Sequence, residues 1–139
     1  MKVRSRRIAA RRVGTAGALA AIGVLAAGVP ADAASSLSVK LSEFKLAPAK
    51  RSVPHGRVTF SVRNTGSTEH ELVVIRTNKK ASQLAKGGTA SEKGAVGEVE
   101  VGQGRTKRLT LNLSKGHYAL ICNIGGHYMA GMRADLTVR

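Results

Sequence analysis

Residues 116–138 read GHYALICNIGGHYMAGMRADLTV, and this stretch decides the fold class. Apolar and polar side chains alternate near both of its ends, and the apolar positions are Tyr118, Leu120 and Cys122, then Ala134, Leu136 and Val138. A period of two is typical of a β-strand with one buried face. Gly125, Gly126 and Gly131 interrupt the segment in between, and glycine is typical of tight loops. We therefore expect two strands joined by a compact loop.

The same alternation recurs upstream of this stretch. Residues 37–41, 58–62 and 109–113 alternate, residues 72–75 form a short apolar run, and residues 96–101 are a further candidate strand. Turn signals separate these segments: Pro54-His55-Gly56, Asn64-Thr65-Gly66, Gly102-Gln103-Gly104 and Ser114-Lys115-Gly116. Helical periodicity is hard to find. The pattern favours an all-β, Greek-key β-sandwich of about seven or eight strands.

One polar stretch, residues 77–97, breaks the regular spacing of these strands and contains Gly87, Gly88 and Gly94 among its glycines. Two interpretations remain open for it. It is either an ordered excursion with one helical turn at Ser82–Lys86, or a mobile loop.

The composition narrows the function classes. A single cysteine excludes a disulfide framework, a four-thiolate zinc site and an iron–sulfur cluster within one chain. The formal charge of +15 invites nucleic-acid binding, but two Tyr, two Phe and no Trp leave no aromatic platform on which bases could stack. We therefore expect no nucleic-acid partner.

The first 33 residues have the layout of an export signal. Six basic residues within 1–12 precede the uncharged run 13–31, and Ala31-Asp32-Ala33 fits the cleavage rule of signal peptidase. We expect an export signal at 1–33, cleavage near Ala33/Ala34 and one domain at 34–139, located in the periplasm, at the cell surface or outside the cell. An uncleaved membrane anchor is the alternative, and twin-arginine export is a minority interpretation.

The expected cleavage changes the charge that matters for function. Residues 1–33 contain six of the 23 basic residues and one of the eight acids, so residues 34–139 keep a formal charge of +10. We expect no stable membrane insertion after cleavage. A strongly basic domain is consistent with a solvated surface and with an acidic partner.

The loop within the opening stretch carries a metal-binding pattern, C-x4-H-x4-M, formed by Cys122, His127 and Met132. The glycines in the loop allow these side chains to converge on one ion. A soft thiolate with imidazole and thioether selects copper over zinc, magnesium or calcium. A trigonal plane of two histidines and one cysteine needs a second His, and His70 begins an expected strand.

These residues resemble the cupredoxins. The resemblance rests on a strand His followed by Glu-Leu-Val-Val, and on Gly-x-Tyr-x-Leu-x-Cys-Asn-x-x-Gly-His-Tyr-x-x-Gly-Met before a terminal strand. It covers residues 37–139, and the loop spacing is similar to that of the rusticyanin and sulfocyanin branch. It implies a near eight-stranded sandwich with one type 1 copper ion. The implied ligands are His70, Cys122 and His127, with Met132 as the weak axial ligand.

The chain departs from the family at two positions. Glu71 stands where plastocyanins and azurins have Asn, and Gly125 replaces the usual Pro of the loop. Neither departure removes a ligand.

The expected site indicates an electron carrier and not an enzyme. Four protein ligands leave the copper ion no open position for a substrate, so we expect outer-sphere Cu(II)/Cu(I) transfer. A copper-binding or delivery protein of the cell envelope is the alternative, and a Cys–His enzyme with Cys122 as nucleophile is a weaker one.

We also expect the electron to pass through His127. An apolar rim around it would dock a redox partner, and we assign to this rim Ile124, Tyr128, Met129 and Ala130. The partner would be acidic, a cytochrome or an oxidase, because the domain is basic. We expect the protein to be a monomer.

Overall fold

The computed structural model describes residues 34–139, and the expected export signal at 1–33 lies outside the described residues. Almost all of the regular structure is β. The elements are β1 Ser35–Ser42, β2 Lys45–Pro48, β3 Ser52–Val53, β4 Gly56–Asn64, β5 His70–Arg76, the 3₁₀ turn η1 Ala81–Gln83, β6 Ala85–Lys86, β7 Thr89–Ala90, β8 Ala95–Val101, β9 Thr106–Leu113, β10 Gly116–Ile121, α1 His127–Ala130 and β11 Arg133–Val138. None of the helices within 34–139 has the length and apolar content needed to cross a bilayer.

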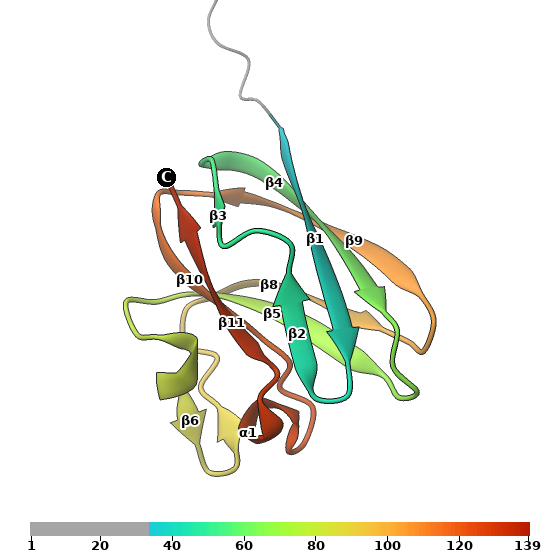
Figure 1. Ribbon diagram of the computed structural model, residues 1–139. Helices are drawn as coiled ribbons and strands as arrows, with labels where there is room; N and C mark the ends of the chain where they lie inside the picture. The colour runs from blue at the N-terminus through green and yellow to red at the C-terminus, as the bar shows by residue number, and fades with distance from the viewer. Residues whose placement is uncertain (1–33) are drawn as a thin grey trace, which may run out of the picture.

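Two sheets pack face to face (Figure 1). The first has the strand order β2-β1-β4-β9 and the second the order β3-β11-β10-β5-β8, while β6 and β7 form a separate hairpin. β1 runs parallel to β4 and β3 runs parallel to β11; the other pairs are antiparallel. The all-β sandwich that the alternation predicts is confirmed. The short strands β2, β3, β6 and β7 were not expected.

The main core lies between the two sheets. Alternate residues of β1 and β4 face it, and the parallel register sets Leu37 beside Phe60 and Val39 beside Val62. Cys122 belongs to the same core. Burial of these apolar side chains is the main force that holds the sheets together.

A second apolar cluster covers the outer face of the five-stranded sheet. The excursion between β5 and β8 folds back over that face, so that both faces of β5 and β10 are buried; the cluster comprises Val73, Ile75, Ala81, Leu84, Ala90, Ala119, Ile121 and Tyr128. This explains why residues 72–75 form an unbroken apolar run instead of alternating. The excursion is ordered, and its helical turn lies at Ala81–Gln83 rather than at Ser82–Lys86.

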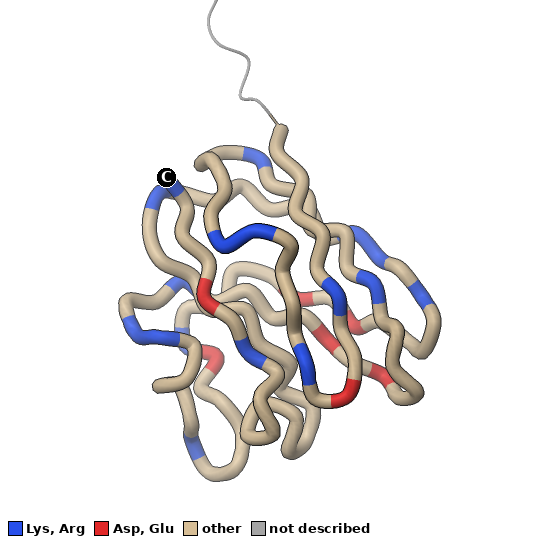
Figure 2. Tube along the Cα trace, viewed as in Figure 1, with Lys and Arg blue, Asp and Glu red and all other residues tan. Residues whose placement is uncertain are grey.

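The two sheets also differ in charge (Figure 2). The strands of the four-stranded sheet contain no acidic residue and six basic ones: Lys40, Lys45, Arg57, Arg63, Lys107 and Arg108. The strands of the five-stranded sheet contain four acids and two bases: Glu71, Glu98, Glu100, Asp135, Arg76 and Arg133. The strands of the four-stranded sheet are therefore basic, whereas those of the five-stranded sheet carry a small excess of acid.

Candidate metal centre

His70 is the first residue of β5 and is fully buried, at 0% exposure. Its position depends on the turn before it, which the buried Asn64 organises. The Asn64 amide donates to the carbonyl oxygens of Thr68 at 2.7 Å and Val101 at 2.8 Å, and its Oδ1 accepts from the Gly66 N–H at 2.8 Å. Because a buried amide needs all of these partners, the turn has little freedom. The sequence analysis identified Asn64 only as part of a turn signal.

Cys122 directly follows β10 and is also fully buried. Its backbone N–H donates to the Met132 carbonyl at 3.0 Å, and its Sγ accepts from the Glu71 N–H at 3.4 Å. Burial raises the pKa of the Cys122 thiol, and the backbone N–H groups of Glu71 and Ile124 oppose that rise. A metal cation overrides such a shift because it binds the thiolate.

The Glu71 side chain braces the start of this loop. Its Oε1 accepts from the Asn123 N–H at 2.8 Å, so the carboxylate ties β5 to the residue after Cys122. Partial burial raises the pKa of Glu71, the Asn123 N–H opposes the rise, and the nearby carboxylates of Glu92, Glu98 and Glu100 add to it.

The loop after Cys122 folds back through two glycines. Gly126 has φ of 81° and Gly131 has φ of 119°, a backbone region that glycine adopts without strain, and they bracket the single turn α1. The His127 N–H donates to the Ile124 carbonyl at 2.8 Å, and the Met132 N–H donates to the His127 carbonyl at 3.1 Å. The return of the chain that the glycines predict is present.

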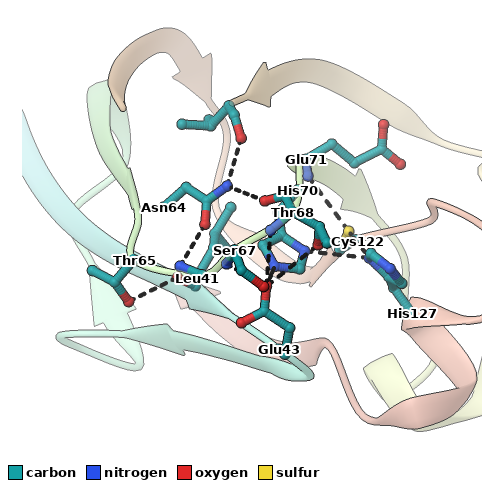
Figure 3. Close-up of polar contacts among 12 residues, drawn as sticks. Leu41, Glu43, Asn64, Thr65, Ser67, Thr68, His70, Glu71, Cys122 and His127 are labelled. Carbon is teal, nitrogen blue, oxygen red and sulfur yellow. Dashed lines mark hydrogen bonds and ion pairs between the residues drawn. The ribbon is translucent and has the colours of Figure 1, made fainter. Parts of the chain in front are cut away.

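Three donor atoms converge where the loop meets the sheet (Figure 3). His70 Nδ1 lies 3.3 Å from His127 Nδ1, and Cys122 Sγ lies 3.4 Å from His127 Nδ1. One ion held in a trigonal plane, with metal–nitrogen bonds of about 2.0 Å, separates two nitrogens by about 3.5 Å. The observed spacing fits one ion, and a thiolate with two imidazoles suits copper. The three side chains form a cluster able to bind one copper ion.

His127 differs from His70 because it is only half-buried. Partial burial lowers the pKa of His127 and the neighbouring His70 lowers it further, while Glu43 opposes the change. A neutral imidazole is the form that binds a metal ion.

Met132 is fully buried in the same core as Cys122. Its backbone is fastened on both sides, by the N–H of Cys122 and by the carbonyl of His127. A role for its thioether as the fourth ligand stays a prediction.

The expected rim around His127 is wrong in one residue and lacks another. Met129 is 53% exposed and Ala130 is exposed, but Tyr128 is 1% exposed and points inward. The Tyr128 hydroxyl donates to the Ala81 carbonyl at 2.6 Å and accepts from the Leu84 N–H at 3.0 Å, so this side chain anchors the loop to the excursion. A single helical turn directs neighbouring side chains to different sides, which alternation along a strand does not anticipate.

Phe44 takes a place at the rim that the sequence analysis did not give it. It lies in the turn between β1 and β2, is 51% exposed, and packs edge-on against His127 with ring centroids 5.6 Å apart. The adjacent Glu43 contacts the other histidine, with Oε1 3.3 Å from His70 Nε2. Both residues sit in a short turn with no periodicity and touch residues far along the chain, so no local pattern marks them.

Comparison with known proteins agrees with this geometry. A protein-family model for the cupredoxin-like domain matches residues 15–138. A comparison with curated protein sequences finds no significant match. Among solved structures, a dithionite-reduced auracyanin from the photosynthetic bacterium Roseiflexus castenholzii is similar at 21% identity and a TM-score of 0.59, over 76% of this chain and 98% of that one.

Two further structures have the same fold. Rusticyanin from Thiobacillus ferrooxidans is 16% identical with a TM-score of 0.60, over 76% of this chain and 78% of that one. Auracyanin A from Chloroflexus aurantiacus, described as a blue copper protein, is 19% identical with a TM-score of 0.56, over 76% of this chain and all of that one, 100%.

Proposed function

The chain belongs to the cupredoxin-like domain family, and from that premise we propose that it is an exported electron carrier with one type 1 copper ion. His70, Cys122 and His127 would be the three strong ligands, with Met132 as the weak axial one. The bound ion would supply a one-electron Cu(II)/Cu(I) couple. Residues 1–33 would direct export, and N-terminal sequencing of the exported protein should then begin near Ala34.

The burial of the donor cluster is the observation that carries this proposal. His70 and Cys122 are 0% exposed, and only His127 reaches the surface. Such a closed cluster offers a substrate no path to the ion, which supports an electron carrier and not an enzyme. The imidazole edge of His127 provides a short route for an electron between the site and a partner.

The surface around His127 supports transient docking of a partner protein. Phe44 and Met129 are both more than half exposed, Ala130 is exposed and Ile124 is half-buried. We define these four residues as the rim. Exposed apolar residues around a functional group are typical of interaction sites.

Charge supports an acidic partner that approaches from one side. The strands of the four-stranded sheet hold only basic charge, although the turn between β1 and β2 carries Glu43, and Lys45 directly follows Phe44 in the chain. The acids of β5 and β8 lie on the other sheet. An acidic redox protein, a cytochrome or an oxidase, would be steered toward the basic layer and would meet the rim with its apolar surface. We propose that the carrier itself is a monomer.

The first test adds Cu(II) to the purified protein and records the visible spectrum. An intense thiolate-to-copper band should appear in wild type and be absent from Cys122→Ser, while the circular dichroism of the variant still reports a folded sandwich. If Cys122→Ser kept the band, Cys122 would not be the ligand.

The axial ligand has its own test. Met132→Leu should keep copper and raise the midpoint reduction potential of the copper site, because losing a weak donor destabilises Cu(II) more than Cu(I). We expect a rise of at least about 59 mV, a tenfold change in the one-electron equilibrium. Met129→Leu, at the exposed neighbour, should change little; a shift confined to that control would overturn the assignment.

The docking proposal is tested by stopped-flow oxidation of the reduced protein by an acidic cytochrome. The rate should fall as salt rises, because exposed charges are screened over about 8 Å at physiological ionic strength. Met129→Lys should slow the reaction at every salt concentration without altering colour. If the rate changed neither with salt concentration nor in Met129→Lys, electrostatic steering and docking at the rim would have no support.

A further inference from the structure

We propose that Glu43, in the turn between β1 and β2, is a positioning residue that holds His70 in one tautomer and favours the oxidised state of the site. The carboxylate would keep the proton of the ring on Nε2 and leave Nδ1 free to bind the ion. The redox part of this inference rests on the proposed function; the tautomer part does not.

A single oxygen atom of Glu43 makes all of the contacts with Ser67, Thr68 and His70 (Figure 3). Oε1 accepts from the Ser67 N–H at 2.7 Å and the Thr68 N–H at 3.1 Å, and it lies 3.3 Å from both of their hydroxyl groups. The same oxygen lies 3.3 Å from His70 Nε2. A turn from one edge of the sandwich thereby fixes both the segment that leads into β5 and the ring of its first residue.

The position of the His70 ring requires this tautomer for metal binding. Nδ1 points into the donor cluster, 3.3 Å from His127 Nδ1, whereas Nε2 points to the carboxylate. A proton on Nδ1 would occupy the place of the ion. A carboxylate accepts but does not donate when ionised, so Glu43 selects the ring that carries its proton on Nε2.

Glu43 keeps its charge at every pH of ordinary interest. The N–H of Glu43 itself is the largest cause that lowers its pKa, and those of Thr68 and Ser67 add to it, so that the pKa of Glu43 falls to about 2 although partial burial opposes this. The inference therefore does not depend on a titration of this group.

A fixed negative charge on the far side of a ligand ring has a predictable redox effect. It attracts the more positive oxidised state more strongly, and the hydrogen bond makes the imidazole a better donor. Both effects favour Cu(II), so that Glu43 should lower the midpoint.

The first experiment needs no metal. Nitrogen-15 NMR of the His70 ring in the metal-free protein at pH 8 should show the proton on Nε2 in wild type. Glu43→Gln retains a carbonyl oxygen at the same place and should keep this tautomer, whereas Glu43→Ala should give a mixture. A proton on Nδ1 in wild type, or the Nε2 tautomer undiminished in Glu43→Ala, would overturn the positioning role.

The second experiment measures the midpoint of the copper-loaded protein. Glu43→Gln removes the charge but keeps the shape, and we expect at least a tenfold shift of the equilibrium toward Cu(I), a rise of about 59 mV. The matched control is Glu69→Gln, an exposed acid next to His70 in the chain that should shift the equilibrium less than threefold. Equal shifts in the two variants would mean that Glu43 acts only as one more surface charge.

Gly66 offers a third variant that leaves Glu43 in place. A Cβ at this position would lie closest to Glu43 Oε1, and 2.7 Å from Oε2 and 2.8 Å from Cδ, so Gly66→Ala requires a shift between the turn and the carboxylate, which is the more flexible of the two. The variant should reproduce the tautomer mixture of Glu43→Ala. An unchanged His70 tautomer in Gly66→Ala, with the carboxylate displaced, would contradict the inference.

The outcomes separate this inference from the proposed function. A wild-type protein that gives no intense band with Cu(II) would refute the copper site, yet the NMR result would still decide whether Glu43 positions His70. A normal band with no effect of Glu43→Gln on the midpoint would refute the redox part of the inference alone.

Discussion

The two sheets of the sandwich share one core but differ on their outer faces. Within residues 34–139 no second layer covers the polar, basic outer face of the four-stranded sheet, and in β1 and β4 buried positions alternate with half-buried or exposed ones. The five-stranded sheet is covered by the excursion, and four consecutive residues of β5, 72–75, are fully buried. A strand covered on both faces loses its alternation, so the difference in sequence pattern records a difference in layering.

The cover also supports the donor loop. The Tyr128 hydroxyl forms hydrogen bonds with the backbone at the 3₁₀ turn. The Asn123 side chain forms hydrogen bonds with the Ala90 backbone and, at 2.6 Å, with the Glu92 carboxylate. These contacts fasten the loop from outside the sandwich. They explain how a loop with Gly125 at the position where related loops have proline is held in place. Among residues 34–139, the four-stranded sheet supports no comparable loop on its outer face.

The strongest test of this comparison truncates a side chain that lies between the five-stranded sheet and the excursion that covers it. Ile75→Ala should lower the free energy of unfolding by about 2–5 kcal/mol, because a fully buried side chain leaves a cavity. Ile75→Val should cost only about 0.5–1.5 kcal/mol. Denaturant unfolding of the metal-free protein measures both. A cost for Ile75→Ala no larger than that for Ile75→Val would show that the cover is not closely packed.

A smaller effect is expected where the loop is tied to the cover. Tyr128→Phe removes one hydroxyl and leaves the buried Leu84 N–H without a partner, which should cost about 1–3 kcal/mol. Tyr118→Phe is the matched control, because its hydroxyl bonds only to the Ser114 carbonyl in a partly buried place, and it should cost less. The reverse order of the two costs would argue against the anchoring role of Tyr128.

The smallest effect should come from the uncovered face. Thr59 and Thr110 lie opposite each other on β4 and β9, and their exposed hydroxyl groups are 2.9 Å apart. Thr59→Val should change the free energy of unfolding by less than about 0.5 kcal/mol, because exposed positions contribute little. A loss as large as that of Tyr128→Phe would mean that the outer face of this sheet is as constrained as the covered one.

The sequence contains the information for the parts of the molecule that follow a local rule. Loop glycines allow Cys122 and His127 to converge, the resemblance to the cupredoxins implies His70 as their partner, and alternation predicts the larger strands. The excursion contains two-residue strands and a three-residue turn, which are too short to show a periodic pattern of apolar residues. Its secondary structure could therefore not be predicted from the sequence.

The residues that support the donor cluster could not be predicted from local sequence patterns, for a different reason. Glu43 and Asn64 act through contacts with residues that no sequence period connects to them, and Asn64 is a buried amide in a segment with the signature of an ordinary turn. Their partners are set by which strands lie side by side. That pairing is a property of the whole fold and not of any segment.

The place of β11 in its sheet means that the donor cluster can form only late in folding. β11 lies between β3 and β10 but follows both of them in the chain, and the loop that carries His127 closes only when the Met132 carbonyl meets the N–H of Cys122. Pairing between distant segments is slow, and sandwiches of this kind fold in milliseconds to seconds. Until β11 has docked, the chain exposes a free thiol that oxidants can attack. The faster β11 docks, the shorter the time in which oxidants can reach the cysteine of the donor cluster.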